Sequence, residues 1–138
     1  MLRENKIINP GVGLLEYGTV FALGGFGYGL LEILWRGYTH WSMIVTGACC
    51  LGSIYRWHKS HQAAAWMPFC LFCGAVITAF ELLAGILVNV IGKMNVWDYS
   101  GFRIHLFGQI CLPYSILWCF LGLPIKLICT KLEAVFCA

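Results

Sequence analysis

Glu81 is the residue whose chemistry is hardest to reconcile with its surroundings, because it lies in the middle of a long apolar stretch. No charged residue occurs within eleven positions of it on either side. If this stretch crosses a membrane, a charge at that depth costs at least about 2.5 kcal/mol and is normally paired or functional. The position predicts either a ligand or proton site at Glu81, or a protonated carboxyl in a hydrogen-bonded seam between helices.

Glu81 belongs to a stripe of small and polar residues that recurs at helical spacing. At 100° per residue, its members fall on one face of a helix. They are Gly74, Thr78, Glu81, Gly85 and Asn89. We expect this face to contact protein or water rather than lipid.

A second stripe occupies one face of residues 21–36. Its members are Phe21, Gly25, Tyr28, Gly29, Glu32 and Arg36. Gly25 and Gly29 have the GxxxG spacing, which lets a second helix approach closely and predicts a homodimer through this face. Glu32 precedes Arg36 by four positions, the favourable order for a helical ion pair. The pair is either structural or marks the mouth of a cavity.

Two pairs of metal-ligating side chains lie close in sequence. His58 and His61 precede Cys70 and Cys73, and two imidazoles with two thiolates could hold zinc. The alternatives are a solvated loop for the histidines and core packing for the cysteines. The Cys70–Cys73 spacing would also suit a thiol oxidoreductase, but such enzymes work on the oxidising side of a membrane. The topology derived below places the pair on the other side, and we expect no cofactor.

The chain that carries these residues is too apolar to fold in water. Of its 138 residues, 60% are hydrophobic and 11% are charged, whereas soluble domains carry about 25% charged residues. Its six tryptophans suit the aromatic belts at membrane interfaces. The net charge of +3 is scattered, which excludes a nucleic-acid partner. The composition predicts an integral membrane protein whose first partner is the lipid bilayer.

The hydropathy pattern predicts an all-α bundle of four transmembrane helices in a single domain, residues 1–138. Its spans are expected at about residues 14–35, 41–57, 67–92 and 106–128. Crossing about 30 Å of hydrocarbon takes about 20 apolar residues, so the second span is the shortest that would suffice. Short connections predict antiparallel neighbours. Pro113 predicts a kink near the start of the fourth span.

The distribution of lysine and arginine predicts the orientation. Six basic residues fall on the side of both termini, and three on the other side. The six are Arg3, Lys6, Arg56, Lys59, Lys126 and Lys131, and the three are Arg36, Lys93 and Arg103. The positive-inside rule therefore places both termini in the cytoplasm, with the protein as a multi-pass component of the cell membrane.

Three segments resemble the signature of a known family. They are residues 24–43 (GGFGYGLLEILWRGYTHWSM), 96–100 (VWDYS) and 108–118 (GQICLPYSILW), with Glu81, Gly85 and Asn89 between them. Over residues 14–122 the chain is similar to the CmpB-like, ABC-transporter type IV family of bacterial membrane proteins. The resemblance implies a transporter component and a polar cluster. The cluster consists of Glu32, Arg36, His40, Glu81, Asn89, Trp97, Asp98 and Gln109.

These patterns together predict a transporter or permease component that binds a small polar solute or cation at Glu81. Asn89 and Gln109 would supply hydrogen bonds to the ligand. An outer polar network would consist of Glu32, Arg36, His40 and Asp98. Tyr28 and Trp97 are further candidate ligand-binding residues. The sequence contains no GxxxxGK[ST] motif, so ATP-driven transport would need a separate ATPase subunit.

Two other classes of function stay open at this point. One is a membrane enzyme, either a thiol oxidoreductase at Cys70 and Cys73 or a lipid-modifying enzyme that uses Glu81. The other is a non-catalytic accessory or sensor subunit. Accessibility of the two thiols from outside would favour the first class, and stable co-purification with a larger membrane protein would favour the second.

Overall fold

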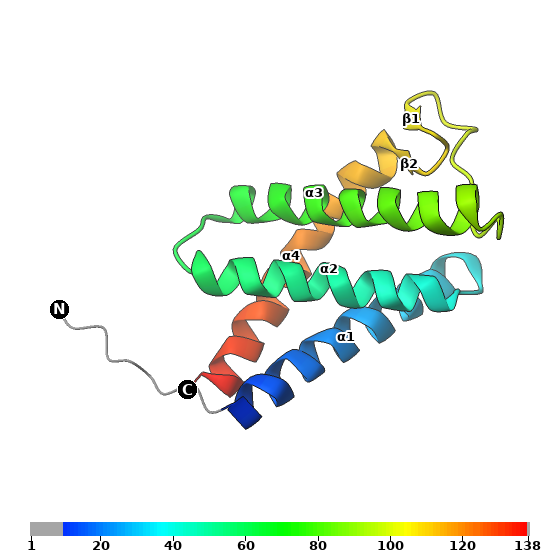
Figure 1. The fold of residues 1–138 in the computed structure, drawn as a ribbon. Coiled ribbons are helices and arrows are strands. Elements are labelled where there is room, and N and C mark those ends of the chain that lie inside the picture. Colours follow the sequence, from blue (N-terminus) through cyan, green and yellow to red (C-terminus); the bar gives the residue numbers. More distant parts are fainter. Residues whose placement is uncertain (1–9, 138) are drawn as a thin grey trace.

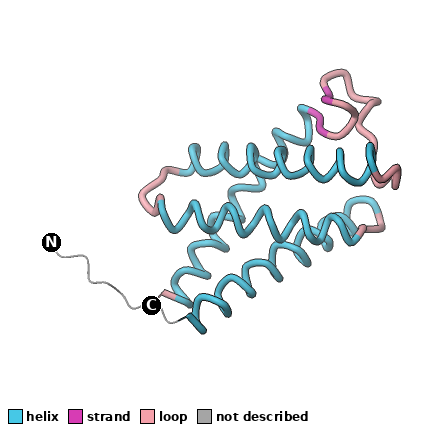
Figure 2. The backbone as a smooth tube through the Cα atoms, viewed as in Figure 1, coloured by secondary structure: helices cyan, strands magenta, loops and turns pink. Residues whose placement is uncertain are grey.

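Four long helices, antiparallel in sequence order, form the fold of the computed structural model, which describes residues 10–137 (Figure 1). The helices are α1 (Pro10–Arg36), α2 (Trp41–Ser60), α3 (Trp66–Gly85), its π-helical continuation η1 (Ile86–Ile91) and α4 (Leu112–Phe136). A short antiparallel hairpin of β1 (His105–Leu106) and β2 (Ile110–Cys111) precedes α4 (Figure 2). The expected all-α class is confirmed.

Three helices of residues 10–137 are long and apolar enough to cross a membrane. They are Gly11–Arg36, Trp66–Ile91 and Leu112–Phe136. Large apolar side chains cover their outer surfaces; Leu14 is 79% exposed and Leu34 is 75% exposed. Helix α2 has more buried residues than α3 or α4, because it packs between α1 and α3 and needs less apolar surface for lipid. Its crossing of the membrane stays a prediction.

Helices α1 and α2 approach each other so closely that their backbones touch through glycine. A Cβ atom added to Gly24 would lie 2.5 Å from the carbonyl oxygen of Gly47, and one added to Gly25 would lie 2.9 Å from that of Ile44. A Cβ added to Gly29 would also contact Ile44. The expectation that the Gly25–Gly29 face joins two copies of the chain is therefore wrong, because α2 of the same chain covers it.

The stripe around Glu81 faces α4 and the hairpin, so the expectation that it contacts protein is confirmed. Gly74 packs directly against Cys119. The Thr78 hydroxyl donates to Ser115 Oγ at 3.0 Å. A Cβ added to Gly85 would lie 2.6 Å from Oε1 of Gln109, so only glycine lets that side chain approach.

The fourth helix differs from the prediction at both ends. It begins at Leu112 rather than near residue 106, because the preceding apolar residues form the hairpin, and it continues to Phe136. The expected kink at Pro113 is wrong, since this residue lies in the first helical turn, where the missing N–H would have had no partner anyway. Pro124 instead lies inside the helix.

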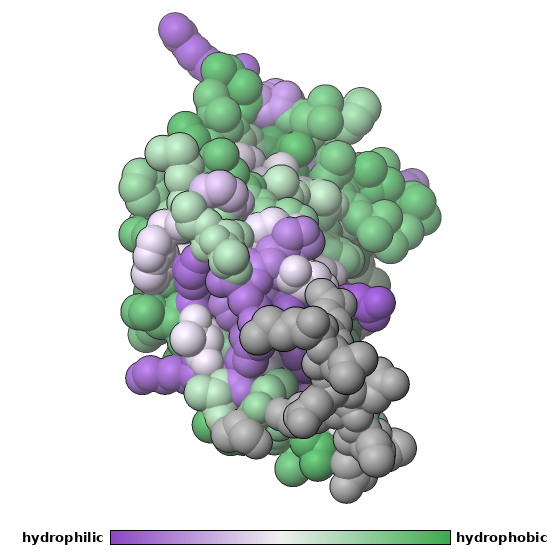
Figure 3. All heavy atoms as spheres, turned by 90° about the vertical axis from the view of Figure 1, so that its left-hand side faces the viewer, coloured by the Kyte–Doolittle hydropathy of each residue, from purple (hydrophilic) through white to green (hydrophobic). Residues whose placement is uncertain are grey.

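Polar side chains close the end of the bundle where α2 ends and α3 begins. Glu16 is 5% exposed and accepts hydrogen bonds from the Tyr55 hydroxyl at 2.5 Å and from Lys59 Nζ at 2.7 Å. His58 lies 3.2 Å from a carboxylate oxygen of Glu133. Figure 3 views this end and shows hydrophilic side chains gathered within a largely hydrophobic surround. We call Glu16, Tyr55, His58, Lys59 and Glu133 the polar cap.

Candidate functional site

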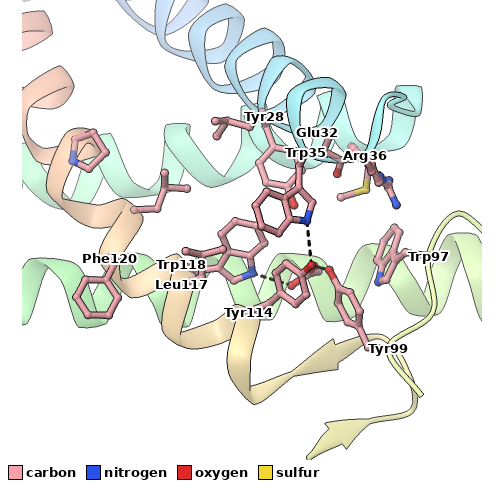
Figure 4. Close-up of a pocket in the computed structure, with 15 residues that line it drawn as sticks. Tyr28, Glu32, Trp35, Arg36, Trp97, Tyr99, Tyr114, Leu117, Trp118 and Phe120 are labelled. Atoms are coloured by element: carbon pink, nitrogen blue, oxygen red, sulfur yellow. Dashed lines mark hydrogen bonds and ion pairs between the residues drawn. The ribbon is translucent and has the colours of Figure 1, made fainter. Parts of the chain in front are cut away.

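A cavity of about 560 Å³ lies between α1, α3, α4 and the loop that follows η1 (Figure 4). Seven of its fifteen described lining residues are aromatic. They are Tyr28, Trp35, Trp97, Tyr99, Tyr114, Trp118 and Phe120. Among its described lining residues, Glu32, Arg36 and Glu81 are the charged ones. The cavity therefore combines an apolar, aromatic wall with a small group of charges.

Glu81 lies at the inner wall of this cavity and is only 2% exposed. The Tyr99 hydroxyl donates to its Oε1 atom at 2.8 Å, and the Trp118 indole N–H donates to its Oε2 atom at 3.0 Å. An indole can only donate, and an ionised carboxylate can only accept. Both oxygens of Glu81 thus have the acceptor role that suits a carboxylate.

Tyr99 reaches Glu81 from the loop outside the helices. Burial and the nearby negative charge of Glu81 raise the pKa of Tyr99. The phenol therefore keeps its proton at neutral pH and remains able to donate to the carboxylate.

The rings around Glu81 pack against one another. Tyr99 stacks on Tyr114 with 5.0 Å between ring centroids, and Trp118 lies 6.0 Å from Tyr114 and 5.9 Å from Tyr28. The Trp35 indole N–H donates to the Tyr114 hydroxyl at 3.1 Å, which joins α1 to α4 across the cavity (Figure 4). Aromatic faces carry negative potential and attract cations. The packing thus gathers several aromatic rings around one carboxyl group.

Glu32 and Arg36 form the predicted ion pair at 2.6 Å, and both also line the cavity. Arg36 Nη1 donates to the carbonyl oxygen of Val96 at 3.1 Å. The guanidinium carbon lies 4.6 Å from the centre of the Tyr38 ring. Both interpretations of the pair therefore apply, because it is structural and it borders a cavity. The described lining residues include two acids, Glu32 and Glu81, and one base, Arg36.

Asn89 and Gln109 act on the loop rather than on the cavity. Asn89 Nδ2 donates to Oε1 of Gln109 at 2.7 Å, and its Oδ1 atom accepts from the Val96 N–H at 2.7 Å. The Trp97 indole N–H donates to the carbonyl oxygen of Gln109 at 2.9 Å. Asn89 lies in the π-helical segment η1, a type of irregularity that often occurs at functional sites. These bonds hold Trp97 and Tyr99 in the cavity wall.

Replacing Asn89 by alanine is expected to loosen this loop and to lower the free energy of unfolding by about 1–3 kcal/mol, because the Val96 N–H and Gln109 Oε1 lose their partner. The measurement is thermal unfolding in detergent. Thr130→Ala is the control, since its exposed hydroxyl bonds to the Lys126 carbonyl within the same helix. A variant at Asn89 as stable as this control would contradict the positioning role.

His40 and Asp98 do not line the cavity, contrary to the outer polar network expected from the sequence. The His40 ring caps α2, accepting from the Ser42 N–H at 3.3 Å. Asp98 is exposed and accepts hydrogen bonds from the N–H and the hydroxyl of Ser100, both at 2.9 Å. These two bonds, the backbone one first, lower the pKa of Asp98. Both side chains thus stabilise local turns.

The four metal-ligand candidates have other contacts in the structure. His58 contacts Glu133, and the His61 ring stacks on Trp57. Cys73 is fully buried in the core, whereas Cys70 packs against Gly122, and neither is in a disulfide. Between residues 10 and 137, no three potential ligands come together as a metal site.

The sequence patterns do not predict the aromatic contacts of Glu81. Tyr114 and Trp118 are one helical turn apart, which is the signal that could have placed them on one face of α4. Tyr99 belongs to the VWDYS segment, and nothing in that segment indicates a contact with Glu81. Which of these rings meets Glu81 depends on the register of α4 against α3.

A family model described as "Putative ABC-transporter type IV" matches residues 3–136 of the chain. This range contains every described residue that lines the cavity. No curated protein and no solved structure matches the chain.

Proposed function

This chain belongs to the ABC-transporter type IV family, and we propose that it is the membrane component of a transporter and binds a small cation beside Glu81. The observation that supports this most strongly is a buried carboxylate at the wall of a 560 Å³ cavity. Two carboxyl groups against one guanidinium among the described lining residues favour a cationic ligand over an anionic one. The aromatic rings provide further attraction for a cation, especially an organic one.

The proposal includes an orientation in the cell membrane. With four spans, α2 among them, and both termini in the cytoplasm, the polar cap lies on the cytoplasmic side. The cavity then lies toward the outer side, at the end of α1 that carries Glu32 and Arg36. A cation from outside would reach Glu81 past the Trp35–Tyr114 bond.

Transport by this chain would need partners. Because the sequence lacks a P-loop, a separate ATPase subunit would supply the energy of ATP, and the polar cap is the end it could reach. A homodimer would have to use an apolar face other than the Gly25–Gly29 face, which α2 covers.

A thiol oxidoreductase receives less support from the geometry. Cys73 has no exposed surface, so a thiol or quinone partner could not reach its sulfur without the core opening. We therefore retain the cation site as the principal proposal.

The direct test compares choline with its neutral isostere 3,3-dimethylbutan-1-ol, using the purified protein in nanodiscs and intrinsic tryptophan fluorescence. Choline is expected to bind at least about tenfold more tightly, because a desolvated cation gains about 2 kcal/mol from aromatic faces in addition to the carboxylate. Equal binding of the two compounds would rule out a cation site.

A further inference from the structure

A second cavity of about 290 Å³ adjoins the first along the groove between α1 and α4. The two cavities share four lining residues, Tyr28, Leu31, Leu121 and Pro124. None of the described residues that line the second cavity is charged. The two adjoining cavities thus form an acidic, aromatic end and an apolar end.

The apolar end opens toward the flank of the bundle. Its rim residues Leu23 and Leu31 on α1 are 47% and 45% exposed, and Ile128 on α4 is 41% exposed. These side chains belong to helices apolar enough to cross a membrane. A ligand in this groove could therefore enter sideways from the hydrocarbon of the bilayer.

We propose that the ligand is a cationic amphiphile whose ammonium head lies beside Glu81 and whose alkyl chain lies in the groove between α1 and α4. The proposal rests on the cation site of the proposed function and adds the class of ligand to it. It follows from the order of the lining residues, charged and aromatic at one end and aliphatic at the other.

The charges of the site argue against a phospholipid as the occupant. A phosphate next to the ammonium head would need a basic partner inside the cavity. Arg36 is the one basic residue among the described lining residues, and it already bonds to Glu32 and to the Val96 carbonyl. A head group with positive charge alone fits these partners better.

The test is a chain-length series from tetramethylammonium to dodecyltrimethylammonium, titrated into the protein in nanodiscs and followed by tryptophan fluorescence. Gly27 lines the groove, and a Cβ added there meets nothing within 4 Å, so leucine at this position should fit and occupy the space for the chain. Gly18→Leu is the matched control on the same helix, because Gly18 is equally open and lines none of the three cavities described for the chain.

For each compound, the quantity compared is the ratio of the dissociation constants of variant and wild type, since partition into the bilayer cancels. Gly27→Leu is expected to weaken binding of the dodecyl compound at least fivefold more than binding of tetramethylammonium. For Gly18→Leu the ratio of dissociation constants should stay constant along the series. A ratio for Gly27→Leu that does not change with chain length overturns the amphiphile proposal. If tetramethylammonium then still binds and loses affinity in Glu81→Gln, the cation site stands; if it does not, both proposals fail.

Discussion

Glutamine in place of Glu81 is expected to weaken choline binding by at least about tenfold while the protein stays folded. A charged contact of this kind is expected to contribute about 1.5–3 kcal/mol, which corresponds to about 10- to 150-fold in affinity. The amide oxygen of glutamine can still accept a hydrogen bond from the Trp118 indole N–H. The change therefore removes the charge and keeps most of the packing. The measurement is a titration of choline into both proteins in nanodiscs, with thermal unfolding recorded in parallel.

The matched control for this variant is Glu133→Gln, which removes a carboxylate from the polar cap instead of the cavity. It should bind choline like the wild type, although it loses the contact with His58. Glu81→Leu is expected to behave differently from Glu81→Gln, because it also leaves the Tyr99 hydroxyl and the Trp118 N–H without a partner. Each lost partner should cost about 1–3 kcal/mol of stability. Unchanged choline affinity in folded Glu81→Gln would contradict the proposed site.

Alanine at Gly24 is expected to lower the free energy of unfolding by about 2 kcal/mol or more. The new methyl group would lie 2.5 Å from the Gly47 carbonyl oxygen and 3.2 Å from the Cα atom of Ala48. These are backbone atoms, so the contact can be relieved only by moving α2 away from α1. Overpacking a tight contact typically costs about 1–3 kcal/mol. The measurement is unfolding by SDS titration, followed by the loss of helical circular dichroism.

Gly27→Ala is the control on the same helix. Its effect on the free energy of unfolding should have the opposite sign. A Cβ at Gly27 meets nothing within 4 Å, and replacing glycine by alanine inside a helix stabilises it by about 0.5–1 kcal/mol. Similar losses of stability in the two variants would show that the effect comes from helix composition rather than from the α1–α2 contact.

The orientation of the Glu81 side chain was predictable, because exposing a carboxyl group to lipid costs free energy and the side chain must therefore face protein. The periodicity of residues 74–89 then placed Gly74 and Gly85 on the same face, and their contacts with α4 and Gln109 agree. Hydropathy alone also placed α1 and α3 near their observed bounds, since both are long and continuous.

Features that depend on tertiary partners were not predictable in the same way. The GxxxG spacing at Gly25 and Gly29 indicates close helix contact, but it does not say whether the partner belongs to the same chain. Residues 105–111 are apolar enough to suggest a helix, yet Gly108 with φ of +69° turns them into a hairpin. His40 and Asp98 were expected in the site because they belong to the polar cluster that the family resemblance implies, whereas bonds to Ser42 and Ser100 fix them locally.

In the proposed site, Glu81 lines a cavity that is reached from the membrane and occupied by a cation. Dicyclohexylcarbodiimide enters apolar phases and modifies carboxyl groups there, so peptide mass spectrometry after labelling reports directly on residue 81. We predict that Glu81 is labelled in the wild-type protein and that tetramethylammonium or a longer alkyltrimethylammonium protects it. If a saturating concentration of the cation leaves the labelling of Glu81 unchanged, the proposed cation site is contradicted. The site is contradicted equally if the reagent does not label Glu81 at all.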